Sequence, residues 1–192
     1  MEQHKACSFF GHRNFKITEE YKQKLTKIFE DLIVNHNVLT FLCGSRSNFN
    51  QLCHFIVTQL KEKYPHIKRV SYPCRNETCI LESERKKWEE IYSHFEKCEV
   101  KLLGVEEEVE FKFKHTAGVS SYVQRNQAII DASEYCVFYY DESYKPELRK
   151  HSKNSLNFYQ PKSGTRLAYN YAQLKKKVVI NIAKPFLFVS LF

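Results

Sequence analysis

The stretch HKACSFFGHRNF, residues 4–15, decides how the rest of the chain is interpreted. Its first half is an apolar run of the length and composition of a buried strand. Gly11 ends that run, and His12 and Arg13 follow at once. A glycine directly after a strand allows a sharp turn and the close approach of another group. We therefore expect a strand whose carboxyl end carries a basic, hydrogen-bonding turn.

Outward from this strand, helical and strand patterns alternate along the chain. The first predicted helix spans residues 18–36, with Thr18 as its N-cap and acidic residues in its first turn. Further helices are predicted at about 48–64, 83–98, 120–132 and 164–177, and further strands at 38–43, 67–73, 135–140 and 178–183. Residues 100–105 are a short strand or a loop, 106–116 have no assignable pattern, and 141–161 are predicted as a long polar loop.

This alternation predicts a single α/β domain over residues 1–192, a Rossmann-like three-layer sandwich with a mostly parallel sheet. Right-handed crossovers place the carboxyl ends of parallel strands at one edge of the sheet. Ligands of such sheets bind at that edge, where the strand order reverses. Residues that follow strands are therefore the candidates for a site.

Composition and charge narrow the class of protein. The 192 residues are 43% hydrophobic and 27% charged, as in globular domains. No apolar run reaches the ~20 residues of a membrane-spanning helix, and the N-terminus lacks a signal-peptide pattern. The seven cysteines are odd in number and scattered, which predicts reduced thiols and a cytoplasmic location. No metal is predicted, because Cys74, Cys79, His94 and Cys98 match zinc-finger spacing poorly. The net charge of +8 suits phosphorylated ligands or nucleic acid.

Small and polar clusters follow several predicted strands or open predicted helices. Glycines let a ligand approach, hydroxyls and helix N-termini donate to phosphate, and arginines bind it in bidentate fashion. Each cluster alone is also ordinary turn or cap chemistry. No G-x-G-x-x-G or P-loop pattern is present. The clusters are Gly11, His12 and Arg13; Gly44, Ser45, Arg46, Ser47 and Asn48; Arg125 and Asn126; Asp141, Glu142 and Ser143; and Ser163, Gly164 and Thr165.

Five segments carry a family resemblance: CSFFGHR, FLCGSRSNFNQL, LKEKYPHIKRV, QRNQAIIDASEYCVFYYDES and SGTRLAYNYAQLKKKVVINI, in this order. Over about residues 5–183 the chain resembles the SLOG superfamily of Rossmann-like proteins (Smf/DprA and LOG), in particular its YpsA-like bacterial branch. The resemblance implies a nucleotide or nucleotide-derived ligand at the strand ends, and the sequence identifies no other cofactor. It implies contacts from Gly11, His12, Arg13, Gly44, Ser45, Arg125 and Asn126, with Ser163, Gly164 and Thr165 on the phosphate side.

Two departures bear on activity. LOG-type phosphoribohydrolases carry a catalytic glutamate where Ala168 stands here, and YpsA-like relatives often carry aspartate where Asn50 stands. The first change leaves enzymatic activity open, with Asp141 and Glu142 as candidate carboxylates. We therefore expect a ligand sensor, and keep two alternatives: a nucleoside-monophosphate phosphoribohydrolase or related N-glycosidase, and a single-stranded nucleic-acid binder using positive charge and twelve tyrosines.

Three further expectations concern the periphery. Residues 141–162 form either a basic lid over the ligand edge or a solvated loop. The apolar tail at 185–192 either packs on the body or adds an edge strand. The resemblance implies a homo-oligomer.

Overall fold

The computed structural model describes residues 4–44, 47–74, 104–109, 119–150, 158–159 and 161–183. Several predictions lie outside these residues. They are the helix at 83–98, most of the segment 100–118, the tail at 185–192, Ser45 and Arg46, and three members of the rejected zinc cluster, Cys79, His94 and Cys98.

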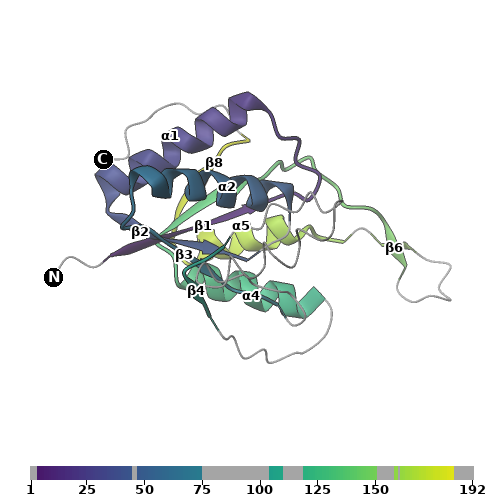
Figure 1. Ribbon diagram of the computed structural model, residues 1–192. Coiled ribbons are helices and arrows are strands. Elements are labelled where there is room, and N and C mark those ends of the chain that lie inside the picture. The colour runs from purple at the N-terminus through teal and green to yellow at the C-terminus, as the bar shows by residue number, and fades with distance from the viewer. Residues whose placement is uncertain are drawn as a thin grey trace, which may run out of the picture.

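A six-stranded sheet with parallel pairing throughout forms the centre of the molecule (Figure 1). Its order is β4-β3-β2-β1-β5-β8. The chain runs from β1 outward to β4 and then returns to the other side of β1, so the strand order reverses between β1 and β5. The strands are β1 (Lys5–Gly11), β2 (Val38–Cys43), β3 (Lys68–Ser71), β4 (Glu107–Glu108), β5 (Tyr135–Tyr139) and β8 (Val178–Asn181).

Helices cover both faces of this sheet, which confirms the predicted Rossmann-like three-layer sandwich. The helices α1 (Glu19–His36) and α2 (Asn48–Lys63) lie on one face, and α4 (Val119–Asp131) and α5 (Gly164–Leu174) lie on the other (Figure 1). Each layer encloses its own group of buried side chains. None of the helices in the described part of the chain combines the length and the apolar character needed to cross a bilayer.

The first helix follows its sequence pattern closely. The hydroxyl of Thr18 accepts a hydrogen bond from the backbone N–H of Tyr21 at 3.3 Å, as the N-cap prediction requires. Asn37 ends the helix in the left-handed conformation, at φ 56°. The apolar face of α1 is buried and packs on the sheet: Leu25, Ile28, Phe29, Leu32 and Ile33.

One helix boundary and one loop, described here, differ from the predictions. Helix α5 ends at Leu174 rather than near residue 177, because Lys176 adopts φ 53° and the N–H of Lys177 bonds back to Ala172 O. The segment 141–161 is not loop throughout. It contains β6 (Arg149–Lys150) and β7 (Phe158–Tyr159), an antiparallel pair that projects from the body of the molecule (Figure 1).

An ion pair fixes the edge strand β4, which lies in the segment without an assignable pattern. Arg69 of β3 is only 2% exposed, and its Nε donates to Glu106 Oε2 at 3.2 Å. The same carboxylate oxygen accepts from the backbone N–H of Arg69 at 2.6 Å, and Lys61 Nζ lies 3.6 Å from the other oxygen. Arg69 also donates to Thr58 of α2 at 2.9 Å. Glu106 thus joins β4, β3 and α2.

Candidate functional site

The turns after β1 and β5 meet at the point where the strand order reverses. His12 follows β1 and is 3% exposed. Its Nε2 accepts a hydrogen bond from the backbone N–H of Asp141 at 3.1 Å. Tyr144 stacks on the imidazole, with ring centroids 4.1 Å apart and 30° between the planes. This is the position in the sheet at which α/β proteins of this topology bind ligands.

The protonation of His12 follows from its surroundings. Burial lowers the pKa of His12, although the backbone carbonyl and the charge of Asp141 act in the opposite direction. The ring is therefore neutral at neutral pH. Nε2 lies 3.1 Å from the backbone nitrogen of Asp141 and 3.2 Å from its carbonyl oxygen, and because the N–H can only donate, we assign the ring proton to Nδ1. Among the described residues no atom accepts from Nδ1, which leaves a buried donor without a partner.

A buried arginine lies at the carboxyl end of β2. Arg125 of α4 is 3% exposed, and its Nη2 and Nε donate to Asn126 Oδ1 at 3.3 and 3.4 Å. Its stem crosses Gly44, since a Cβ on that glycine would lie 3.3 Å from Arg125 Cδ. The structure therefore brings Gly44, Arg125 and Asn126 together. Arg125 is thus buried beside Gly44 and not exposed on the surface of α4.

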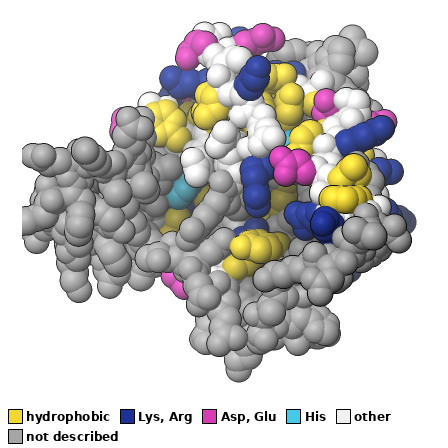
Figure 2. Space-filling view, turned by 90° about the vertical axis from the view of Figure 1, so that its right-hand side faces the viewer, with side chains coloured by type: hydrophobic (Ala, Val, Ile, Leu, Met, Phe, Trp, Pro, Cys, Tyr) yellow, Lys and Arg dark blue, Asp and Glu magenta, His cyan; other side chains and the backbone are white. Residues whose placement is uncertain are grey.

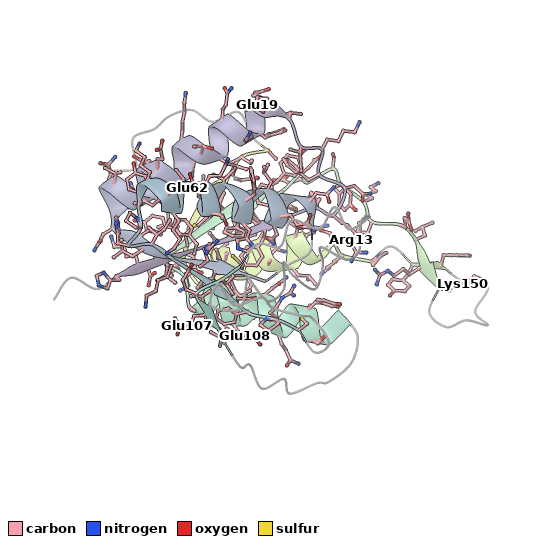
Figure 3. All side chains as sticks on the ribbon, in the orientation of Figure 1. Arg13, Glu19, Glu62, Glu107, Glu108 and Lys150 are labelled. Carbon is pink, nitrogen blue, oxygen red and sulfur yellow. The ribbon has the colours of Figure 1, made fainter. Side chains whose placement is uncertain are left out.

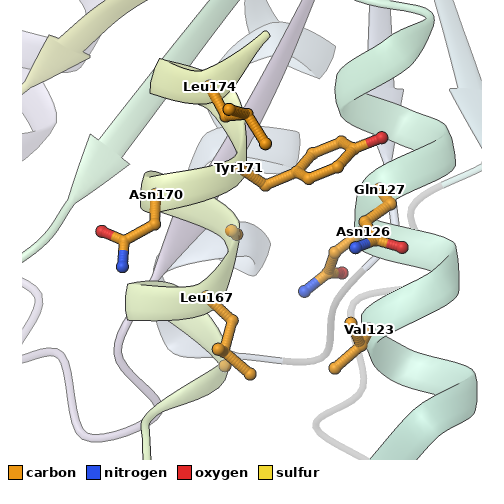
Figure 4. A pocket seen from close by; sticks show the side chains of 9 residues that line it. Val123, Asn126, Gln127, Leu167, Asn170, Tyr171 and Leu174 are labelled. Carbon is orange, nitrogen blue, oxygen red and sulfur yellow. The ribbon is translucent and has the colours of Figure 1, made fainter.

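The N-termini of α4 and α5 lie side by side. Asn126 and Gly164 line one cavity between the two helices (Figure 4). The hydroxyl of Ser163 caps α5 by accepting from Arg166 N at 3.0 Å. Thr165 is 8% exposed, whereas a Cβ on Gly164 would meet no atom within 4 Å. Backbone N–H groups at adjacent helix starts favour an anion.

Gly11 and Arg13, which flank His12 in the turn after β1, have different surroundings. The space beside Gly11 is taken by Phe49 of α2, whose Cβ and Cγ would each lie 2.4 Å from a Cβ on the glycine. Packing of α2 therefore accounts for this glycine.

Arg13 is exposed on the same turn (Figure 3). Figure 2 views the side from which β6 projects, and Lys and Arg side chains are spread over it among hydrophobic and uncharged groups.

Asp141, one of the two candidate carboxylates, is poorly suited to donating a proton. Hydrogen bonds from the Ser143 hydroxyl and backbone N–H, at 2.6 and 2.8 Å, lower the pKa of the exposed Asp141. Asp141 is thus ionised at neutral pH and serves as a turn-capping group. Glu142 is exposed beside it. Ala168 of α5 is 3% exposed and packs in the core between this helix and the sheet, so it has a structural role.

The described cysteines are also unsuited to nucleophilic chemistry. All five are free and buried: Cys7, Cys43, Cys53, Cys74 and Cys136. Burial raises the pKa of the Cys136 thiol to about 11 and raises those of Cys7 and Cys53 as well. These thiols remain protonated at neutral pH.

Sequence reasoning missed Tyr144, which covers His12. The N–H of Tyr144 bonds to Asp141 O at 3.2 Å, which closes a turn directly after β5. An Asp followed two residues later by Ser is a turn signal, and it was available in the sequence. The stacking of Tyr144 on His12 could not be predicted from the sequence, because it depends on the pairing of β1 with β5.

Comparison with known proteins identifies one distant relative. The chain is 28% identical over 157 residues to the uncharacterized SPbeta prophage-derived protein YoqJ of Bacillus subtilis (strain 168). The match covers 79% of this chain and 80% of that protein. No family model matches the chain.

Proposed function

We propose that this protein is a SLOG-like sensor that binds a phosphorylated, nucleotide-derived small molecule at the carboxyl edge of its sheet. The ligand lies between the turns that follow β1 and β5 and the N-termini of α4 and α5. The single observation that carries the proposal is the buried Nδ1 of His12, which has no partner among the described residues and lies at the strand-order reversal.

An unpaired buried donor is costly, and a phosphate oxygen removes that cost. Leaving a buried polar group unsatisfied destabilises a fold by about 1–3 kcal/mol. An acceptor supplied by a ligand restores this energy as binding energy. Arg125 and the N-terminus of α5, which Ser163 caps, add positive charge that favours an anion.

Binding accounts for the described residues better than hydrolysis does. Asp141 is ionised and held by Ser143, and Ala168 has no acidic group, so of the candidates from the sequence only Glu142 is left as the proton donor that N-glycoside cleavage needs. Buried free thiols agree with a reducing compartment, and we place the protein in the cytoplasm.

Two isosteric variants of His12 test the proposal. The amide of asparagine reproduces the Nδ1 position of histidine, whereas that of glutamine reproduces Nε2. We expect His12→Gln to weaken AMP binding at least about tenfold, as loss of a hydrogen bond to a charged group does. His12→Asn should stay within about threefold of wild type. Isothermal titration calorimetry with AMP, ADP-ribose and inorganic phosphate measures both effects.

The control variant is Lys27→Ala, which removes an exposed charge on α1, on the other face of the sheet. It should bind AMP as wild type does. If none of the three compounds binds wild type, or if the two His12 variants lose equal affinity, the proposal is contradicted.

A substitution at Gly44 separates the site from the fold. The Cβ of Gly44→Ala would lie 2.4 Å from Ile129 Cδ1 and 3.3 Å from Arg125 Cδ, and both are flexible parts of side chains. We expect the free energy of unfolding to fall by less than about 1 kcal/mol, because the side chains can rotate away. Displacing Arg125 should weaken AMP binding about tenfold. Urea denaturation and calorimetry on one preparation check both; unchanged affinity would place Arg125 outside the site.

A further inference from the structure

The antiparallel strands β6 and β7 form an arm that projects from the body of the molecule (Figures 1 and 3). All four of their residues are exposed: Arg149, Lys150, Phe158 and Tyr159. Two strands of two residues each enclose no core of their own, and an isolated two-stranded ribbon is marginally stable in water. The aromatic rings of this β6–β7 arm therefore do not serve the packing of the domain core.

The register of the arm puts a cation and an aromatic ring on each of its two faces. Arg149 is opposite Tyr159, and Lys150 is opposite Phe158. Directly opposite residues of an antiparallel pair point to the same face, whereas successive residues of one strand point to opposite faces. In agreement with this, Lys150 Nζ lies 5.3 Å from the centroid of the Phe158 ring. Both faces of the arm thus combine positive charge with apolar surface.

Exposed apolar side chains cluster on this arm. Eight large apolar side chains are exposed among the described residues, and three of them lie here: Leu148 at 60%, Phe158 at 56% and Tyr159 at 40%. Exposed apolar groups that cluster within a polar rim mark interaction sites. Aromatic residues and arginine are also the residue types enriched at the centres of protein interfaces. The composition of the arm is therefore that of a surface for a partner.

The charge of the arm favours an acidic partner. Four cations and one acid lie in the described part of residues 144–162: Lys145, Arg149, Lys150, Lys162 and Glu147. Within the part of the chain that the structure describes, none of these cations forms an ion pair with an acid. Complementary charge speeds association and excludes partners of the same sign. A surface rich in carboxylates meets this requirement.

An acidic protein segment fits the arm better than a nucleic acid does. Proteins that bind single strands follow the phosphate backbone along a positively charged groove and stack bases on open ring faces. The arm is a projection, and one face of the Phe158 ring is covered by Lys150. Leu148 adds exposed aliphatic surface, which has no ring on which a base could stack.

We infer that the β6–β7 arm docks an acidic, partly apolar segment of another protein. Carboxylates of that segment pair with Arg149 and Lys150, and its apolar side chains pack on Phe158 and Tyr159. The inference goes beyond the proposed ligand binding and does not depend on it, because none of these four side chains belongs to the candidate site.

Fluorescence anisotropy with a labelled random copolymer of glutamate and tyrosine tests the inference. Wild type should bind this copolymer more tightly than it binds polyglutamate, which lacks apolar groups. Phe158→Ala should weaken binding of the copolymer at least about tenfold, as at an interface hot spot, and should change the binding of polyglutamate much less. Lys150→Ala should weaken binding of both polymers, and added salt should do the same because it screens exposed charges.

Two variants on α1 serve as matched controls. Val34→Ala changes an apolar side chain that is 62% exposed, and Lys27→Ala removes an exposed cation. Both should bind the copolymer as wild type does. Because Phe158 is 56% exposed, Phe158→Ala should keep the urea denaturation curve of wild type, which separates a loss of contact from a loss of fold.

Competition and a nucleic-acid probe complete the test. AMP should not displace the copolymer, because the arm lies apart from the turns after β1 and β5, and oligothymidine should bind more weakly than the copolymer. The inference is overturned by a wild type that does not bind the copolymer or by a Phe158→Ala variant that binds it equally well. Displacement by AMP, or tighter binding of oligothymidine, would overturn it too, since the contact would then lie at the strand ends or the partner would be a nucleic acid.

Discussion

Replacing Glu106 by alanine should lower the free energy of unfolding by about 3 kcal/mol, because it removes a carboxylate that pairs with a buried guanidinium. Arg69 is 2% exposed, and the carboxylate of Glu106 accepts from both its side chain and its backbone N–H. We expect a value at the lower end of the range for buried pairs, since the Glu106 side chain is itself 22% exposed. Urea denaturation measures the change.

The pH dependence of the same variant has a defined sign. Burial raises the pKa of Glu106, but the hydrogen bonds and charge of Arg69 outweigh it and hold the pKa below its ordinary value of 4.5. A depressed pKa adds stability above the ordinary value that is lost as the pH falls through the folded-state pKa. The stability gap between wild type and Glu106→Ala should therefore be full at neutral pH and shrink below pH 4.5.

A double variant serves as the control for the ion pair. Arg69→Met with Glu106→Leu replaces both charges by apolar groups and should recover most of the stability lost in Glu106→Ala. A Glu106→Ala protein as stable as wild type, with a gap that does not change with pH, would show that this ion pair does not anchor β4.

Gly11→Ala should cost about 1–3 kcal/mol, the usual range for overpacking a core. The new Cβ would lie 2.4 Å from Cβ and Cγ of Phe49, which are the base of the side chain and cannot rotate away. Phe49 is fully buried and contacts Phe15 and Tyr139 edge-on or tilted, at centroid distances of 5.3 and 6.2 Å. The start of α2 therefore has to shift, which urea denaturation will register.

Gly164→Ala is the matched control, since nothing lies within 4 Å of the added Cβ. Its stability should equal that of wild type or exceed it by about 0.5 kcal/mol, because alanine restricts the unfolded chain. Equal stabilities for the two alanine variants would mean that α2 is not seated against the end of β1.

The sequence predicts a helix or strand best where that element carries a residue pattern of its own. The pattern of α1, from Thr18 to His36, specifies its N-cap and its length, and both are confirmed. Strand β4 has two residues, Glu107–Glu108, and is held in place by Arg69 from far along the chain. No periodicity arises from two residues, so no local pattern identifies this strand.

Side-chain burial at the site depends on contacts that the sequence does not display. Arg125 looks like an exposed helical arginine, and it is buried because Gly44 leaves room for its stem. Gly11 looks like an opening for a ligand, and the opening is filled by Phe49. Both cases involve residues brought together by strand order, which determines where a glycine faces a helix.

The ring nitrogens of His12 give the most direct test of the proposed ligand contact. Proton–nitrogen correlation spectra of protein labelled with ¹⁵N-histidine, with the signals assigned by comparison with His12→Asn, report each nitrogen separately. We expect a protonated Nδ1 and an unprotonated Nε2 in the free protein, and on addition of AMP a downfield, slowly exchanging Nδ1 proton with Nε2 unchanged. An Nδ1 signal that stays the same while AMP is bound would contradict the account.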